Sequence, residues 1–218
     1  MEKIITVDGL ASSGKSTLSQ NLSKKLGWPW FSTGVLYRGM AYVGLKENFT
    51  EKEYLSFFKS QDWSIQLTDL KSLFFYRGKD ISPQLYQPAI DEKASLFSSH
   101  PPYRKALISV QRAFYKPHSE KGLVLEGRDC GTVLFPSAPL KIFLTAPDDR
   151  RAKRRARDRK ETAQVILQSQ KSRDQRDQER SFAPAVPPED ALCLDSGKYT
   201  ASQLVDIVYQ KAQTTFLL

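Results

Sequence analysis

The nine residues from Gly9 to Thr17 constrain the fold of this chain more than any other feature of its sequence. They read Gly-Leu-Ala-Ser-Ser-Gly-Lys-Ser-Thr and fit the phosphate-loop pattern G-x-x-x-x-G-K-[ST]. An apolar run at 4–7 predicts a strand before the loop, and 16–26 has the apolar spacing of a helix after it. In that context the glycines let successive backbone N–H groups line a nest for phosphate oxygens at the helix N-terminus.

This loop predicts that the chain binds a nucleoside triphosphate, and two of its side chains have separate tasks. The Lys15 ammonium places a positive charge on the β- and γ-phosphates, so we expect it to be catalytic as well as binding. The Ser16 hydroxyl is expected to ligate Mg²⁺. The expected binding residues of the loop are Gly9, Leu10, Ala11, Ser12, Ser13, Gly14, Lys15, Ser16 and Thr17.

Strand-like and helix-like segments alternate along most of the chain, which indicates an α/β fold with a mostly parallel sheet. The region from about 48 to 100 breaks this alternation and is expected to form a small antiparallel insertion with a helix over 87–97. The expected strands are 4–7, 28–31, 123–125, 142–144 and 191–194, and the expected helices are 16–26, 39–47, 103–115, 147–159 and 201–216.

Composition excludes several classes of protein. No apolar stretch approaches 18 residues, so we expect no membrane span, and the N-terminus lacks the apolar core of a signal peptide, so we expect a cytoplasmic protein. Two cysteines and two histidines provide neither a disulfide framework nor a His-based zinc site. With 40% hydrophobic residues in 218, the chain can bury the core of one domain.

Positive charge is concentrated in one segment. The chain has 33 Lys and Arg against 24 Asp and Glu, a net charge of +9. Residues 150–180 contain twelve of these cations and five of the acids, and so carry seven of the nine excess charges. Such a segment favours an anionic partner. A nucleic-acid-binding module is one alternative, but the segment has no aromatic residue for base stacking, which favours the phosphates of small molecules.

Among proteins with a phosphate loop, a kinase of a small acceptor fits best. The chain has no Asn-Lys pair with which a GTPase would recognise guanine. The strand at 123–125 leads into Glu126-Gly127-Arg128-Asp129, which carries a cation where a motor ATPase would have a run of acids. An insertion and an arginine-rich lid suit an enzyme that must keep water away from the γ-phosphoryl group.

The sequence resembles bacterial cytidylate kinases over nearly its whole length. The resemblance lies in the phosphate loop and in the stretches 32–38, 94–95, 111–114, 125–136, 139–144, 173–180 and 192–196. It implies a nucleoside monophosphate kinase fold in a single domain over 1–218, with a five-stranded sheet flanked by helices. The core would comprise 1–47, 101–149 and 181–218, the monophosphate-binding insertion 48–100, and the lid 150–180.

The resemblance also implies the reaction, which is transfer of the γ-phosphoryl group of ATP to CMP or dCMP with Mg²⁺. A monomer with small-molecule substrates is expected, without nucleic acid or membrane. Lys15, Arg128, Arg173 and Arg180 are expected to be catalytic, and Arg151 and Arg154 to help bind ATP. The expected CMP-binding residues are Thr33, Arg38, Ser95, Arg112, Arg128, Asp129, Arg173, Asp177 and Arg180.

Within that set, each residue type suits its expected contact. Arg38 and Arg128 are forks that suit a phosphate. Arg112 is expected to donate to the acceptor edge of cytosine and Asp129 to accept from its amino group, near Ser95, while Asp177 accepts from a ribose hydroxyl.

Several alternatives stay open at this stage. Asp129 could instead form a salt bridge with Arg128, and Asp8 could either contact the water shell of Mg²⁺ or stabilise a turn. Thr33 and Glu126 stand where the family usually has Ser and Asp, and a role of Glu126 at Mg²⁺ would involve one more methylene of reach. The lid is about five residues shorter than in familiar members, and a uridylate-directed kinase is the alternative enzyme.

Overall fold

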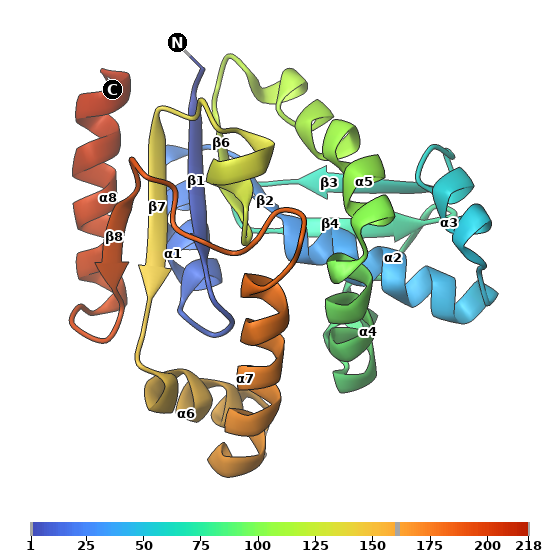
Figure 1. The fold of residues 1–218 in the computed structure, drawn as a ribbon. Helices are drawn as coiled ribbons and strands as arrows, with labels where there is room; N and C mark the ends of the chain where they lie inside the picture. Colours follow the sequence, from blue (N-terminus) through green and yellow to red (C-terminus); the bar gives the residue numbers. More distant parts are fainter. Residues whose placement is uncertain (1, 160–161, 218) are drawn as a thin grey trace.

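The computed structural model describes residues 2–159 and 162–217, and its centre is a parallel sheet. The strands follow the order β2-β6-β1-β7-β8, and each neighbouring pair is parallel (Figure 1). This confirms the expected α/β fold with a five-stranded sheet. The strands are β1 (Ile4–Gly9), β2 (Trp30–Ser32), β6 (Leu123–Glu126), β7 (Leu140–Thr145) and β8 (Leu192–Asp195).

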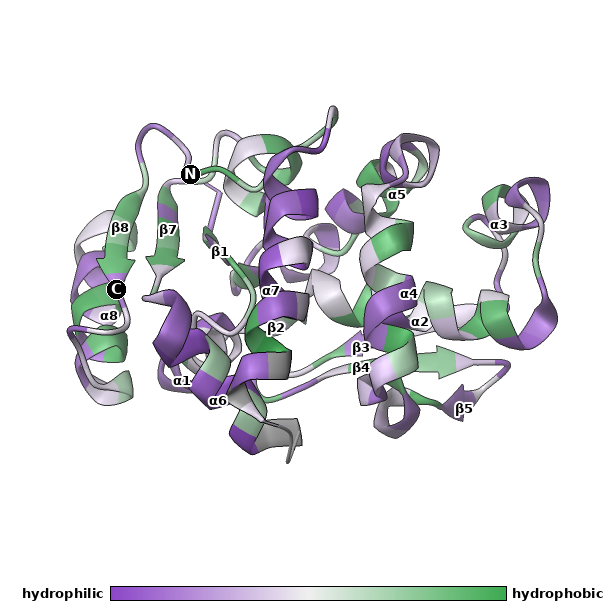
Figure 2. Ribbon diagram, turned by 60° about the horizontal axis from the view of Figure 1, so that its bottom comes forward, coloured by the Kyte–Doolittle hydropathy of each residue, from purple (hydrophilic) through white to green (hydrophobic). Residues whose placement is uncertain are grey.

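Alternating residues of β1 serve two hydrophobic clusters, one on each face of the sheet. Ile5 and Val7 pack with α1 (Lys15–Leu26) and α8 (Ala201–Phe216), whereas Ile4 belongs to the cluster on the opposite face. The central side chains of both clusters are fully buried. Figure 2 shows the contrast between the largely hydrophobic strands and the hydrophilic lid helices.

The insertion is built on α2 (Thr33–Glu47) and adds an antiparallel sheet in the order β3-β4-β5. Phe74 of β4 is fully buried and lies so close to Gly39 of α2 that a Cβ there would be 2.2 Å from the Phe74 ring. The insertion therefore shares its core with the parallel sheet. Its elements are α3 (Glu51–Phe57), β3 (Trp63–Leu67), β4 (Ser72–Tyr76), β5 (Lys79–Asp80), η1 (Ser82–Tyr86) and α4 (Pro88–Ser99).

From the insertion the chain returns to the sheet through α5 (Pro101–Ala113) and the short turn η2 (Lys116–His118). Between β6 and β7 it forms η3 (Cys130–Leu134), one turn of π-helix, in which the Phe135 amide donates to the Cys130 carbonyl at 2.7 Å. No helix in the described part of the chain is both long and apolar enough to span a membrane.

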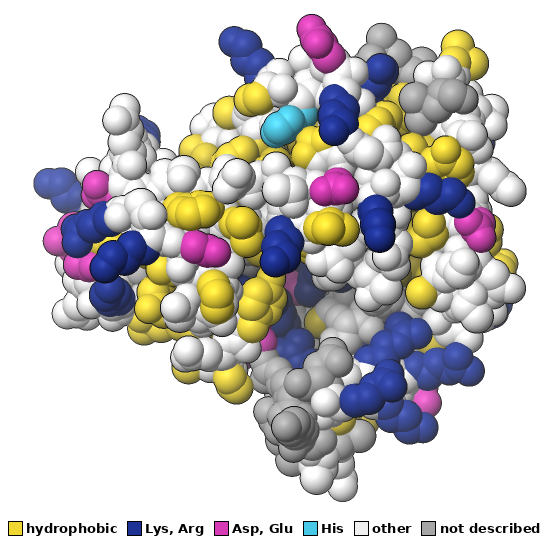
Figure 3. Space-filling model, turned by 180° about the vertical axis from the view of Figure 1, so that it is seen from behind, with side chains coloured by type: hydrophobic (Ala, Val, Ile, Leu, Met, Phe, Trp, Pro, Cys, Tyr) yellow, Lys and Arg dark blue, Asp and Glu magenta, His cyan; other side chains and the backbone are white. Residues whose placement is uncertain are grey.

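The lid consists of α6 (Asp148–Arg159) and α7 (Ala163–Gln178), which lie beyond the carboxyl ends of the strands (Figure 1). Ala152, Ala156 and Ile166 form a small cluster between the two helices. The arginines of α6 divide between two faces, with Arg151 buried and Arg157 exposed. In Figure 3, Lys and Arg side chains gather over the region of α6 beside a hollow in the surface.

Candidate active site

The phosphate loop connects β1 to α1 with the backbone conformation that its glycines allow. Gly9 and Gly14 have φ of 143° and 98°, and Ser12 also lies in the left-handed region at 56°. A Cβ at Gly9 would be 2.1 Å from the carbonyl oxygen of Leu144 on β7. Only glycine fits that position, because the loop begins in contact with the neighbouring strand.

Lys15 is buried at the start of α1, and its ammonium group turns back onto the loop. Its Nζ donates to the Leu10 carbonyl at 2.6 Å. Burial, followed by the positive charges of Arg128 and Arg173, holds the pKa of Lys15 well below its usual value, although Glu126 opposes the shift. A cation in these surroundings is stabilised when an anion such as a phosphate binds beside it.

Ser16 and Glu126 form the pair of oxygen groups that could hold Mg²⁺. The Ser16 hydroxyl donates to Glu126 Oε1 at 2.7 Å, so the longer side chain at this position does reach the loop. Glu126 Oε2 is buried and has no hydrogen-bond partner among the described residues. Mg²⁺ prefers oxygen ligands and needs only one or two from the protein, besides water and phosphate oxygens. The donor set therefore fits this ion.

Three of the expected arginines gather around the carboxylate of Asp177, and two of them, Arg128 and Arg173, also act on Lys15. Arg128 Nε donates to Asp177 Oδ2 at 2.9 Å, and Arg180 Nη1 lies 3.7 Å from Asp177 Oδ1. Burial opposes ionisation of Asp177, but Arg128 and Arg180 keep its pKa below the usual value. Burial together with Arg128 and Arg38 lowers the pKa of Arg173 to about 9. Arg173 Nε finds no hydrogen-bond partner within the described ranges.

Arg104 of α5 is a residue of this site that the sequence analysis missed. Its Nη2 donates to Asp129 Oδ2, its Nη1 donates to the Ser98 carbonyl at 2.9 Å, and its guanidinium lies over the ring of Tyr37. Arg104 and Asp129 are both buried. This pair provides a hydrogen-bond donor and an acceptor side by side in the candidate site. The alternative pairing of Asp129 with Arg128 is not what the structure shows.

Arg112 lies elsewhere. Its Nε donates to the Leu134 carbonyl at 2.8 Å and its Nη2 to the Val133 carbonyl at 2.9 Å. The expected contact of Arg112 with a base does not match this geometry, because its guanidinium is bound to the η3 backbone. The signal for Arg104 was present in the sequence, since it is the only other arginine of α5.

Arg38, Thr33 and Ser95 come from the insertion side of the site. Thr33 Oγ1 donates to the Glu126 carbonyl at 2.9 Å, which joins the start of α2 to β6. Ser95 Oγ accepts a hydrogen bond from Arg176 of α7 at 2.9 Å. Arg38 is bound through its Nε to Asp91 of α4.

The two lid arginines expected to bind ATP contact the phosphate loop itself. Arg151 Nη1 donates to the Ala11 carbonyl at 3.0 Å and to Asp174 Oδ2, while Asp174 Oδ1 accepts from the Ala11 amide at 3.2 Å. Arg154 Nη2 donates to the Ser196 carbonyl, and its Nη1 lies 3.4 Å from the Ser13 carbonyl. Both lid helices are thereby attached to the loop.

Asp8 stabilises a turn. Its two carboxylate oxygens accept hydrogen bonds from the amides of Cys130 and Gly131, at 2.9 and 2.7 Å. Burial raises the pKa of Asp8 to about 6, although these hydrogen bonds oppose the shift. Of the two roles considered for Asp8, the structure therefore supports the turn at the start of η3.

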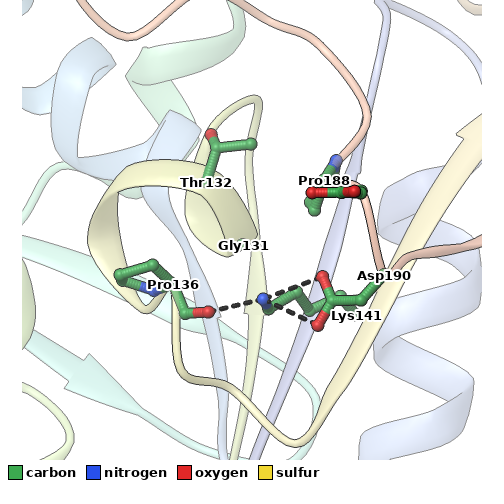
Figure 4. Close-up of a pocket in the computed structure, with 7 residues that line it drawn as sticks. Gly131, Thr132, Pro136, Lys141, Pro188 and Asp190 are labelled. Carbon is green, nitrogen blue, oxygen red and sulfur yellow. Dashed lines mark hydrogen bonds and ion pairs between the residues drawn. The ribbon is translucent and has the colours of Figure 1, made fainter.

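A pocket lies away from the phosphate loop, between η3, the start of β7 and the connection into β8 (Figure 4). Its buried cation, Lys141, is bound to the Pro136 carbonyl and to both carboxylate oxygens of Asp190. The charge of Lys141 is therefore already balanced, and this pocket offers it to no ligand.

The parallel sheet, the phosphate loop with its buried lysine and the arginine-rich lid define a P-loop phosphotransferase. A family described as cytidylate kinase matches residues 5–214. A cytidylate kinase of Bdellovibrio bacteriovorus is 38% identical over 213 residues, which cover 96% of this chain and 97% of that protein. Another, from Caldicellulosiruptor bescii, is 36% identical over 219 residues and 96% of each chain. This chain belongs to the cytidylate kinase family, as the sequence resemblance implied.

Solved structures agree with the fold. An uncharacterised protein from Eubacterium ventriosum aligns with a TM-score of 0.56 at 17% identity, over 98% of this chain and 99% of that one. At that identity the likeness concerns the fold alone.

Proposed function

We propose that this member of the cytidylate kinase family phosphorylates CMP and dCMP with Mg²⁺ and ATP in one direct, in-line step. An oxygen of the CMP phosphate attacks the γ-phosphorus, the bond to the β–γ bridging oxygen breaks, and ADP leaves. The observation that carries the proposal is the cluster of the buried Lys15 with the partly buried Arg128 and Arg173, beside the buried Arg104–Asp129 pair. It combines cations for two phosphates with a donor and an acceptor for a base.

On the donor side, the loop amides and Lys15 bind the β- and γ-phosphates, and Ser16 with Glu126 would hold Mg²⁺. The ion, when bound, neutralises charge on the phosphate oxygens. Arg151 and Arg154 act by fixing the loop, because their guanidinium groups are bound to its carbonyls or to the adjoining Ser196.

On the acceptor side, Arg38 and Arg128 bind the CMP phosphate and Asp177 accepts from a ribose hydroxyl. Arg104, in place of Arg112, donates to the acceptor edge of cytosine, and Asp129 accepts from its amino group. Uracil would present an oxygen to Asp129, and this mismatch of two acceptors disfavours UMP.

Arg173 and Arg180 stabilise the negative charge on the transferring group. Arginines placed in this way contribute roughly 10³- to 10⁵-fold in related phosphoryl transfers. A covalent intermediate on Cys130 is disfavoured, because burial and the neighbouring Asp8 raise the pKa of its thiol well above the usual value.

The test is an acceptor panel of CMP, dCMP, UMP and AMP, with ADP release followed in a coupled assay. We expect CMP and dCMP to have the highest kcat/KM and Lys15→Met to abolish activity with every acceptor. The base assignment is wrong if the kcat/KM for AMP or UMP equals that for CMP. Retention of activity in Lys15→Met would contradict the donor site.

A further inference from the structure

Arg38 is held in place on two sides by residues of the insertion. Its Nε donates to Asp91 Oδ1 at 2.8 Å, and its guanidinium lies 5.3 Å from the ring centroid of Tyr86. Its Nη1 lies over the first turn of α2, where a Cβ on Gly34 would be 2.8 Å away. Asp91 binds Arg38 through Nε, so the terminal nitrogens keep the N–H groups with which a guanidinium binds an anion.

Asp91 is also bound from the lid. Its Oδ2 lies 3.4 Å from Arg155 Nη2 of α6, so one carboxylate joins α2, α4 and α6. Only 12% of the Asp91 side chain is exposed. Burial opposes its ionisation, but the positive charges of Arg38, Arg173 and Arg155 together keep its pKa below the usual value.

The contact of Asp91 with the lid is one of several on the same helix. Ser95 and Ser98 lie four and seven positions further along α4, which places them on the same face as Asp91. Ser95 accepts from Arg176, and the Ser98 carbonyl lies 3.5 Å from Arg180 Nη1. Among the described residues, this face of α4 contacts Arg155 and Arg176 of the lid helices and Arg180, which follows α7, and the Asp91 carboxylate that meets Arg155 also holds Arg38.

We propose that Asp91 is a positioning residue for the acceptor phosphate: it orients Arg38 and connects that arginine to Arg155 of the lid. When the lid lies against α4, Arg38 is fixed with its terminal nitrogens free for the CMP phosphate. Binding of the acceptor phosphate and closure of the lid are then coupled through one side chain. This inference rests on the proposed function, in which Arg38 contacts that phosphate.

The test compares Asp91→Asn, Asp91→Ala and the matched control Glu92→Gln, whose carboxylate is next on α4 but 61% exposed. Loss of a hydrogen bond to a charged group predicts a rise of roughly 10- to 100-fold in the KM for CMP in Asp91→Ala. A smaller rise is expected for Asp91→Asn, which keeps one acceptor oxygen. The KM for ATP in both variants, and both constants in Glu92→Gln, should stay within about twofold.

Two further measurements separate positioning from a general structural role. Cytidine, which has no phosphate, should inhibit Asp91→Asn and the unsubstituted enzyme equally. In an Arg38→Met background, Asp91→Asn should add no further rise in the KM for CMP, because the residue through which it acts is gone.

The proposal is overturned if the KM for CMP is unchanged in Asp91→Ala, or if cytidine binding weakens in Asp91→Asn. It is also overturned if the effects of Arg38→Met and Asp91→Asn on the KM for CMP are additive. If Arg38→Met itself leaves the KM for CMP unchanged, the assignment of Arg38 fails and the inference with it. An unsubstituted enzyme that is inactive with CMP overturns the proposed function, so the failures are distinguishable.

Discussion

Arg104 and Arg112 lie on one helix, and their surroundings alone separate what they do. Arg104 is buried against Asp129 and Tyr37, whereas Arg112 binds the carbonyls of Val133 and Leu134. Burial opposes protonation of Arg104, but Tyr37 and Asp129 raise its pKa further above the usual value. Its charge is therefore permanent, as a dependable donor to a base requires.

These surroundings predict different outcomes for the two arginines. Arg104→Met should raise the KM for CMP roughly 10- to 100-fold and reduce the preference for CMP over UMP, because Asp129 loses the partner that orients it. Arg112→Met should leave that preference intact and instead lower the free energy of unfolding by about 1–3 kcal/mol, since two η3 carbonyls lose their donor. Steady-state kinetics with both acceptors and urea unfolding measure the two effects. A loss of preference in Arg112→Met would favour the original assignment.

At the scale of elements, the helices and strands with a clear hydrophobic periodicity could be predicted from the sequence. All five strands of the parallel sheet and the helices α1, α4, α5, α6 and α8 lie close to the expected ranges. The expected helix at 39–47 is longer than predicted, because α2 already begins at Thr33. The stretch Ser32-Thr33-Gly34 has the composition of a turn, and only the tertiary contacts of Thr33 and Arg38 show it to be helical.

Among the elements that escaped prediction, α3, α7 and η3 did so for different reasons. α3 begins with a capping box in which Thr50 and Glu53 bind each other's backbone amides, a signal that the sequence does contain. α7 has few apolar residues on any one face, and contacts of its arginines and acids with the rest of the molecule hold it. η3 depends on Asp8, which is 122 positions away from the Cys130 amide that it binds. No local pattern could show that contact.

The attachment of the lid to the phosphate loop predicts what Asp174→Asn will do. The substitution removes the charge that holds Arg151 beside Ala11, so the lid should loosen over the triphosphate site. We expect the KM for ATP to rise about tenfold, and ADP release without CMP to increase relative to release with CMP, because water enters.

The control for this prediction is Lys153→Gln on the outer face of α6, where the lysine side chain is 74% exposed. Both readouts should be unchanged in it. An Asp174→Asn variant with the same ratio of the two ADP-release rates as the unsubstituted enzyme would show that the loop contact does not keep the lid closed.

At the scale of the whole molecule, the insertion and the parallel sheet depend on one cluster. Phe74 of β4 is buried in the same cluster as Phe31 and Ile4, so we expect Phe74→Ala to lower the free energy of unfolding by about 3–5 kcal/mol. Trp63 stacks on Phe74, whereas Trp28 and Trp30 belong to the cluster on the other face. Tryptophan fluorescence and far-UV circular dichroism should therefore shift together in urea.

Leu96→Ala provides the comparison, because the Leu96 side chain of α4 is 51% exposed. This substitution should change the free energy of unfolding by no more than about 0.5 kcal/mol. Two separate transitions in Phe74→Ala, one for each spectroscopic probe, would show that the insertion unfolds independently.

The central position of β1 in the parallel sheet also determines when that sheet can form during synthesis. Its partners on both sides come from the second half of the chain, since Ile4 pairs with Leu123 and Ile5 with Leu140. At 5–20 residues per second, roughly 6–24 s separate translation of β1 from translation of its first neighbour. During that interval the emerging strand has no sheet to join, and the phosphate loop that it carries has no Leu144 carbonyl to pack against. Nucleotide can bind a complete phosphate loop only after β6 and β7 have been translated, so we expect ATP to stabilise the chain at a late stage of folding.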